Sequence, residues 1–272
     1  MTTLFRVLAV LPLSLLHAIG AALGWVAFLA SPTYRRRFLA NARQAGYAFG
    51  QVRGAVAAGG RLIAEVPRLW FGAPAAVQWS GEHLIDEALA RGRGIVFLTP
   101  HLGCFEATAQ GYAGRYGPIT VLYRPARKAW LRPLVDQARA RRNLVTAPTT
   151  LAGVKQMLKA LQAGQAVGLL PDQVPPQGLG VWAPFFGKPA YTMTLSARLA
   201  RQTGAQVLLA WGERLAWGAG YRIHLRRWDG DLPTAPEAAA TQVNDRMEAL
   251  IRECPAQYLW GYARYKTPRE AA

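Results

Sequence analysis

A histidine and a glutamate stand five residues apart where the sequence predicts that a strand gives way to a helix. Residues 94–98 form a short run of β-forming side chains, Pro100 ends it, and helix-favouring residues begin at Glu106. His101 therefore falls on a strand-to-helix turn, a common place for catalytic groups in α/β proteins. A histidine held by a carboxylate is a general base for a hydroxyl, so His101 and Glu106 are candidate catalytic residues. The alternative is a histidine that caps a helix, with a glutamate favoured by the helix dipole.

Two later strand ends also carry polar residues. Tyr123 and Arg124 close the next predicted strand, and Asp172 and Gln173 follow a later one. Open α/β sheets bind ligands at the carboxyl ends of their strands, so we expect Arg124 to hold an anion there. Asp172 is able to bind a metal, orient a base or cap a turn. Together these four residues are the candidate substrate-binding residues: Tyr123, Arg124, Asp172 and Gln173.

Other kinds of active site lack their sequence patterns. The four histidines have no metal-ligand spacing, and the chain contains no glycine-rich phosphate loop and no nucleophile elbow. Cys104 lies inside the candidate motif and is a conceivable thiol nucleophile, although its neighbour Phe105 favours a buried packing role. The sequence therefore contains no recognisable pattern for a metal or cofactor site, and we expect neither.

The composition describes a folded and strongly basic protein. Of 272 residues, 51% are hydrophobic, which allows a sizeable core, and 32 Lys and Arg outweigh 15 Asp and Glu to give a net charge of +17. Such a charge attracts polyanions: nucleic acid, anionic lipid or an acidic carrier protein. Two cysteines are too few for a disulfide scaffold and fit a reducing compartment.

The N-terminal segment predicts attachment to a membrane. Residues 4–30 are almost wholly apolar, which exceeds the ~20 residues needed to cross a bilayer. Residues 28–32 make a poor signal-peptide cleavage site, and three arginines follow at 35–37, which favours retention of the body on the cytoplasmic side. We predict an anchor over residues 1–31 and a catalytic domain over 32–272. A helix lying in the membrane interface, or one packed on the domain, remains an alternative.

The remainder alternates between strand and helix patterns. We expect helices over 38–92 and a long loop over 174–191. Strands are predicted at 94–98, 118–123, 144–146, 166–170 and 206–211, a hairpin at 215–228, and helices at 126–141, 150–163, 192–202 and 235–252. This order predicts an α/β fold with a mixed, largely parallel sheet flanked by helices.

These motifs occur in a specific order along the whole chain. His-x4-Glu at 101–106 is followed by Tyr-Arg-Pro at 123–125, Pro-Asp-Gln at 171–173, Phe-Phe-Gly-Lys-Pro at 185–189 and an aromatic, basic tail at 258–266. Together they resemble the lipid A late acyltransferases, the lauroyl and myristoyl transferases within the lysophospholipid acyltransferase superfamily. The resemblance implies a glycerolipid acyltransferase-like fold with an N-terminal membrane-anchoring helix.

The resemblance also implies a reaction. The family moves a fatty acyl group from acyl carrier protein to a hydroxyl of a lipid A precursor at the cytoplasmic face of the inner membrane. His101 would be the base, Glu106 its partner, Arg124 a ligand for phosphate or developing charge, and Asp172 a support for the site. The acidic carrier, the anionic lipid and the membrane surface would account for the positive charge, and we expect no nucleic-acid partner.

Other functions are compatible with the same motifs. The acceptor is alternatively an ornithine-containing lipid or another anionic glycolipid. A thioesterase-like hydrolase would use the same base on water. An inactive membrane-binding protein is a third reading, against which the intact pair of His101 and Glu106 argues.

Overall fold

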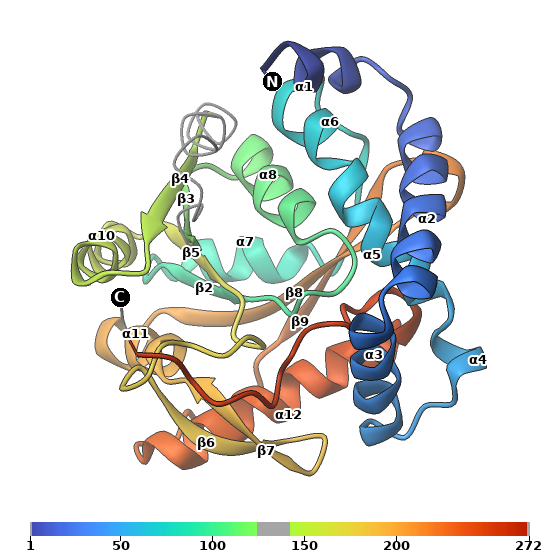
Figure 1. Ribbon diagram of the computed structural model, residues 1–272. Coiled ribbons are helices and arrows are strands. Elements are labelled where there is room, and N and C mark those ends of the chain that lie inside the picture. The colour runs from blue at the N-terminus through green and yellow to red at the C-terminus, as the bar shows by residue number, and fades with distance from the viewer. Residues whose placement is uncertain (1, 124–141, 271–272) are drawn as a thin grey trace.

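A seven-stranded sheet forms the centre of the protein (Figure 1). The computed structural model describes residues 2–123 and 142–270. The sheet order is β1-β9-β8-β2-β5-β3-β4, and every neighbouring pair is parallel except β8 and β9. The strands are β1 (Val77–Ser80), β2 (Ile95–Leu98), β3 (Ile119–Tyr123), β4 (Leu144–Pro148), β5 (Ala166–Leu169), β8 (Gln206–Arg214) and β9 (Tyr221–Arg227). The predicted α/β class with a mixed, largely parallel sheet is confirmed.

Helices cover both faces of this sheet (Figure 1). Along β2, Ile95 and Phe97 pack towards one helical layer while Val96 and Leu98 pack towards the other, and all four are buried. A strand covered on both faces reads as a continuous apolar run, which is the pattern found at 95–98. The first layer contains α7 (His83–Ala90) and α8 (Phe105–Arg115), and the second contains α10 (Leu151–Gln162), α11 (Leu195–Thr203) and α12 (Pro236–Glu253).

The N-terminal helices gather together beside the sheet (Figure 1). They are α1 (Thr2–Ala9), α2 (Leu13–Ala30), α3 (Pro32–Gln44), α4 (Phe49–Val52), α5 (Gly54–Ala64) and α6 (Val66–Phe71). Helices α2 and α5 approach so closely that a Cβ atom at Gly24 would collide with the Val56 carbonyl oxygen, and one at Gly60 would collide with the backbone of Gly20 and Gly24. The apolar N-terminal helix is therefore present, and it is packed on the body of the protein.

Two predictions about secondary structure were wrong. The segment 38–92 is not entirely helical, because β1 pairs in parallel with β9 at the edge of the sheet. The segment 174–191 is not a loop throughout: β6 (Gly180–Phe185) and β7 (Lys188–Met193) form a separate antiparallel hairpin. Its turn places Phe186 and Gly187 at φ angles of 47° and 72°, which suits a tight two-residue hairpin connection.

The hairpin predicted at 215–228 begins earlier than expected. Its first strand is β8, which runs from Gln206 to Arg214, and residues 215–220 form the connection, which contains the short helix η2 (Ala216–Gly218). The predicted strand at 206–211 and the predicted hairpin therefore belong to one continuous unit. The helix predicted at 126–141 lies outside the described residues.

Candidate active site

His101 and Asp172 meet at the carboxyl ends of two adjacent strands. β2 and β5 are parallel neighbours, so the turns that follow them lie at the same edge of the sheet. The His101 ring Nδ1 lies 2.7 Å from Asp172 Oδ1, and the His101 backbone N–H donates to Asp172 Oδ2 at 2.8 Å. One buried carboxylate thus holds both the ring and the backbone of the histidine.

The Asp172 carboxylate is kept ionised in this position. Burial alone would raise its pKa, but the adjacent His101, through its charge and its hydrogen bonds, holds the pKa below the usual value. Tyr258, from the C-terminal tail, also interacts with this carboxylate: burial together with Asp172 raises the pKa of Tyr258, so the phenol stays protonated. An ionised Asp172 accepts a hydrogen bond from Nδ1–H, which keeps the proton on Nδ1 and so fixes the tautomer of His101.

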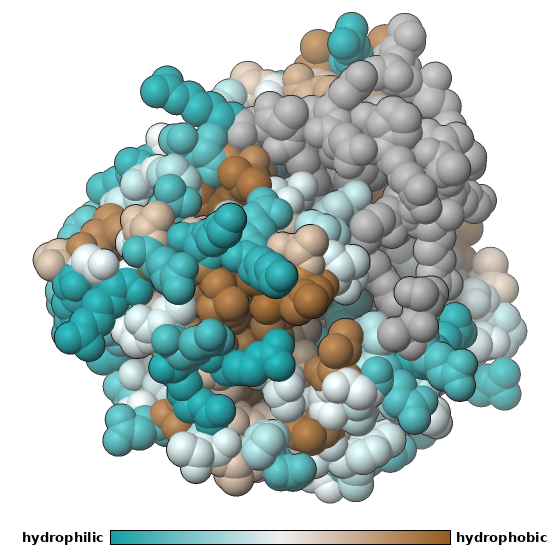
Figure 2. Space-filling model, turned by 90° about the vertical axis from the view of Figure 1, so that its left-hand side faces the viewer, coloured by the Kyte–Doolittle hydropathy of each residue, from teal (hydrophilic) through white to brown (hydrophobic). Residues whose placement is uncertain are grey.

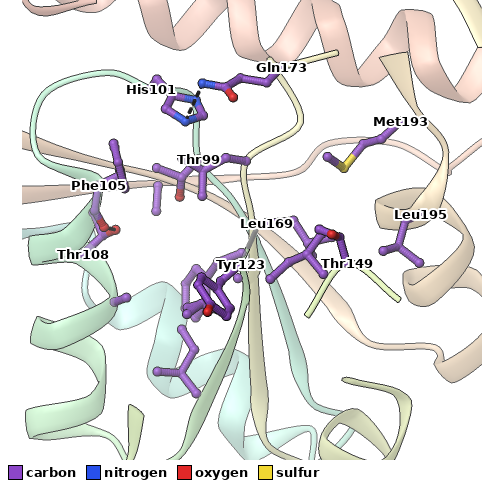
Figure 3. A pocket seen from close by; sticks show the side chains of 18 of the residues that line it. Thr99, His101, Phe105, Thr108, Tyr123, Thr149, Leu169, Gln173, Met193 and Leu195 are labelled. Atoms are coloured by element: carbon purple, nitrogen blue, oxygen red, sulfur yellow. Dashed lines mark hydrogen bonds between the residues drawn. The ribbon is translucent and has the colours of Figure 1, made fainter. Parts of the chain in front are cut away.

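With Nδ1 protonated, the other ring nitrogen of His101 carries the lone pair. Gln173 Nε2 lies 2.9 Å from His101 Nε2, and its amide donates to that lone pair (Figure 3). His101 Nε2 thus already accepts a hydrogen bond from a group that lines the cavity, the Gln173 amide. A substrate hydroxyl that replaces the Gln173 amide would meet an acceptor in the correct geometry for proton transfer.

The Nε2 side of His101 faces a large apolar cavity of about 650 Å³. In Figure 3, Phe105 and Thr108 of α8 lie on one side of it, Met193 and Leu195 lie on the other, and Tyr123 stands between them. Figure 2 shows apolar surface inside a frame of hydrophilic side chains on the side of the molecule that carries α10. The cavity volume lies in the range of small-molecule sites, roughly 300–1,000 Å³.

One lobe of the cavity runs beneath α8 along the face of the sheet. It is lined by apolar side chains from five strands and two helices: Ile85, Phe97, Tyr112, Ile119, Val121, Leu144, Ala210, Ile223 and Leu225. The other lobe lies towards α10 and α11 and includes Arg198, the one cationic side chain that lines the cavity within residues 2–123 and 142–270. The cavity therefore offers a long apolar compartment on one side and a positive charge on the other.

The C-terminal tail fixes the backbone of the histidine turn. The Leu259 N–H donates to the His101 carbonyl at 3.1 Å, and the Gly103 N–H donates to the Gln257 carbonyl at 3.1 Å. Gly103 has a φ angle of +60°, and a Cβ atom there would collide with the carbonyl oxygen of Gly212. A glycine is needed at this point because of both its φ angle and this close approach.

The structure brings most of the predicted site residues together. His101, Glu106, Tyr123 and Gln173 line the cavity, and Asp172 lies behind His101. Asp172 holds the histidine ring and backbone by hydrogen bonds, and its part in a reaction stays a prediction. Glu106 lines the same cavity from the first turn of α8, and its pairing with His101 stays a prediction. Arg124 lies outside the described residues.

Sequence reasoning missed two residues of this site. Tyr258 was seen only as part of the aromatic tail, and its interaction with Asp172 depends on a contact between segments 86 positions apart. Arg198 lies on α11 in a stretch without any recognisable motif, so no local signal marked it.

Cys104 has the surroundings of a packing residue. It is fully buried, and burial raises the pKa of its thiol well above the usual value, which disfavours the nucleophilic thiolate. Among residues 2–123 and 142–270, no group of three or more His, Cys, Asp or Glu side chains has an arrangement that would hold a metal ion.

Comparisons with known proteins identify the family. The family model for bacterial lipid A biosynthesis acyltransferases matches residues 1–267. The chain is 28% identical over 214 residues to a lipid A biosynthesis palmitoleoyltransferase of Escherichia coli (strain K12), covering 76% of this chain and 69% of that protein. It is 30% identical over 193 residues to a lipid A biosynthesis lauroyltransferase of the same organism, covering 70% and 61%. Because the family model matches almost the whole chain, this chain belongs to the bacterial lipid A biosynthesis acyltransferase family.

Proposed function

We propose that the protein transfers a fatty acyl group from the thioester of acyl carrier protein to a hydroxyl of a lipid A precursor. His101 acts as the general base. The observation that carries the proposal is the buried His101–Asp172 pair, whose free ring nitrogen faces a cavity of about 650 Å³ with a long apolar lobe. Family membership supports the acyltransferase chemistry, and the geometry around His101 supports the roles proposed for the residues.

The reaction follows from the tautomer of His101. The acceptor hydroxyl takes the position of the Gln173 amide and donates to His101 Nε2. As Nε2 takes the proton, the hydroxyl oxygen attacks the thioester carbonyl carbon and the carbonyl electron pair moves onto its oxygen. When the tetrahedral intermediate collapses, the C–S bond breaks and the thiolate receives the proton from the imidazolium. Asp172 stabilises that imidazolium while it exists.

The apolar lobe suits the acyl chain of the donor. Its walls include side chains such as Phe97, Ile119 and Ile223, which offer hydrocarbon contact to the chain. Burial of a chain gains roughly 0.8 kcal/mol per CH₂, so a fatty acyl group binds well there. Arg198, in the other lobe, is suited to bind a phosphate of the acceptor or of the donor's arm.

Two predicted residues complete the proposal. Glu106 assists His101 or the acceptor hydroxyl from the first turn of α8. Arg124 binds phosphate or developing negative charge. The net charge of +17 attracts both the acidic carrier protein and an anionic membrane, which we propose to be the cytoplasmic face of the inner membrane.

The test is an assay of the purified protein with acyl carrier protein loaded with a fatty acid. Mass spectrometry should detect an acylated product only when a lipid A precursor is added. His101→Ala should abolish its formation, whereas His83→Ala, an exposed histidine on α7, should not. Free fatty acid released at the same rate with and without acceptor would instead identify a thioesterase. Acylation of an ornithine-containing lipid in preference to the precursor would establish the alternative acceptor.

A further inference from the structure

Helix α2 presents an apolar face to the outside of the protein. Leu15, Ile19, Leu23, Val26 and Leu29 are 42–65% exposed, and they recur at intervals of three or four residues, so they share one side of the helix. An apolar face of this extent is unfavourable in water and is typical of an interaction site.

Neighbouring elements extend this apolar surface. Val7 of α1, Val10 in the link to α2 and Ile63 of α5 are also exposed, and α1, α2, α5 and α6 lie together on one side of the molecule (Figure 1). Trp217 of η2 is 94% exposed, and the next residue, Gly218, lies against the start of α2 at Ser14. Tryptophan is enriched at membrane–water interfaces. We call α1, α2, Ile63 and Trp217 the apolar surface.

The N-terminal segment that carries most of the apolar surface has charges of one sign. Residues 1–64 contain seven arginines and neither aspartate nor glutamate. The first acidic residue, Glu65, is fully buried and is bonded to His17 and Arg214. An apolar face with only cationic side chains in the same segment complements an anionic lipid bilayer.

The contacts of α2 show how such a bilayer would meet it. Near its start, the His17 ring lies 3.0 Å from the Glu65 carboxylate, which is held by Arg214 of β8. Near its end, Phe28 is buried against Phe38 and stacks on Phe49. Between these points the helix packs against α5. The helix is therefore attached to the domain along its whole length.

A helix attached in this way cannot cross a bilayer without taking its partners with it. Helix α5 carries Arg61 and follows Arg53, and the buried ion pairs of Glu65 stand at its end. These charges would then have to enter the hydrocarbon, where ionisable groups are strongly disfavoured. An 18-residue helix also spans only ~27 Å, slightly less than the hydrocarbon thickness of ~30 Å.

We propose that α2 lies in the plane of an anionic membrane, with the apolar surface immersed at the boundary between headgroups and acyl chains. This is the mode of a monotopic protein rather than of a protein with a spanning anchor. The inference deepens the proposed function, because it states how an enzyme that acts on lipids meets the bilayer. Its test uses no turnover, so it fails or succeeds independently of the acyl-transfer reaction.

The experiment measures the depth of α2 in vesicles of phosphatidylglycerol and phosphatidylethanolamine. One cysteine at a time replaces Leu15, Leu23 or Leu29 in the full chain, in a Cys254→Ser background in which the remaining Cys104 is fully buried, and each new cysteine carries a nitroxide label. Val145, an exposed apolar residue of β4 outside the apolar surface, is the matched control site. Accessibility to dissolved oxygen, compared with a water-soluble nickel chelate, reports the depth of each label.

The expected result is one shallow depth shared by all three α2 labels, with the Val145 label remaining in water. A label at Leu23 that lies much deeper than those at both ends would show a spanning helix and overturn the proposal. Three water-accessible labels would overturn it as well. In a second measurement, Ile19→Asp combined with Leu23→Asp should abolish flotation with these vesicles, whereas Val145→Asp should not. Normal flotation of the double variant would contradict the proposal.

Discussion

Replacement of Asp172 by asparagine tests how the histidine is activated. The side chain keeps its size, but one of its two oxygens becomes an NH₂ group. The native carboxylate accepts from the His101 ring at 2.7 Å and from the His101 backbone at 2.8 Å, and it interacts with the Tyr258 phenol. The new amide therefore places a donor opposite a donor in a buried position.

Two consequences follow, and their sizes differ. If the amide NH₂ faces the ring, Nδ1 must accept, and the proton moves to Nε2, where it blocks proton transfer from the substrate. Loss of an oriented general base lowers turnover by ~10²–10⁴, which is about 3–5 kcal/mol in the activation barrier. One buried unpaired donor costs roughly 1–3 kcal/mol of stability, so the variant of Asp172 should still fold.

The assay is kcat for acyl transfer, with the melting temperature of each variant measured beside it. Asp172→Asn should lose most of its kcat while KM for the donor changes little, because the apolar lobe is untouched. Tyr258→Phe is the matched control, since it removes one donor and leaves the carboxylate, and its loss should be smaller. If Asp172→Asn kept a kcat close to the wild-type value, the role assigned to this carboxylate would be refuted.

Three further predictions concern other parts of the molecule. Gly103→Ala should lower the melting temperature markedly more than Gly46→Ala, because both glycines have positive φ angles but only Gly103 lies against a neighbouring carbonyl. Arg198→Ala should raise KM for an anionic substrate, and Lys155→Ala, an exposed cation on α10 outside the cavity, should not; equal effects would show that Arg198 is an ordinary surface charge. Burial would raise the pKa of Glu65, but Arg214 and His17 outweigh burial and lower this pKa to about 2. The free energy of unfolding, measured in urea, should therefore fall as pH drops from about 4.5 towards about 2. If Glu65→Gln showed the same dependence of this free energy on pH as the wild type, the prediction would be contradicted.

The candidate site could be predicted from the sequence because its signals were local. A strand, a proline and a helix start within a dozen residues placed His101 on a turn, and the same logic placed Asp172 and Gln173 after β5. The pairing of His101 with Asp172 is different in kind, because 71 residues separate them. Their contact depends on β2 and β5 being neighbours in the sheet, and no local sequence pattern predicts the order of the strands.

The errors in the fold also have physical causes. β1 is only four residues long and is half-buried, so neither its length nor its alternation distinguished it from the surrounding helices. Pro184 and Pro189 lie within β6 and β7, where proline argued against strands. The hairpin tolerates them because it stands apart from the main sheet and both of its strands are edges.

The N-terminal segment shows what an apolar run leaves open. Hydropathy alone marks Leu13–Ala30 as long and apolar enough to cross a membrane. The residues that tie this helix to the domain are Gly20, Gly24 and His17, and their partners are Gly60 and Glu65. Small residues and one histidine carry little weight in a hydropathy average, although they determine which face of the helix is occupied by protein.

The central claim is that His101 takes a proton from a lipid hydroxyl while the acyl group moves directly from donor to acceptor. The most direct measurement is rapid-quench mass spectrometry of one turnover, with wild-type protein, His101→Ala and the full substrate pair. The account predicts acylated lipid from the wild type, no acyl-enzyme at any time, and almost no product from His101→Ala, with both proteins equally folded. Product formation by His101→Ala at the wild-type rate, or an acyl group trapped on the protein, would contradict it.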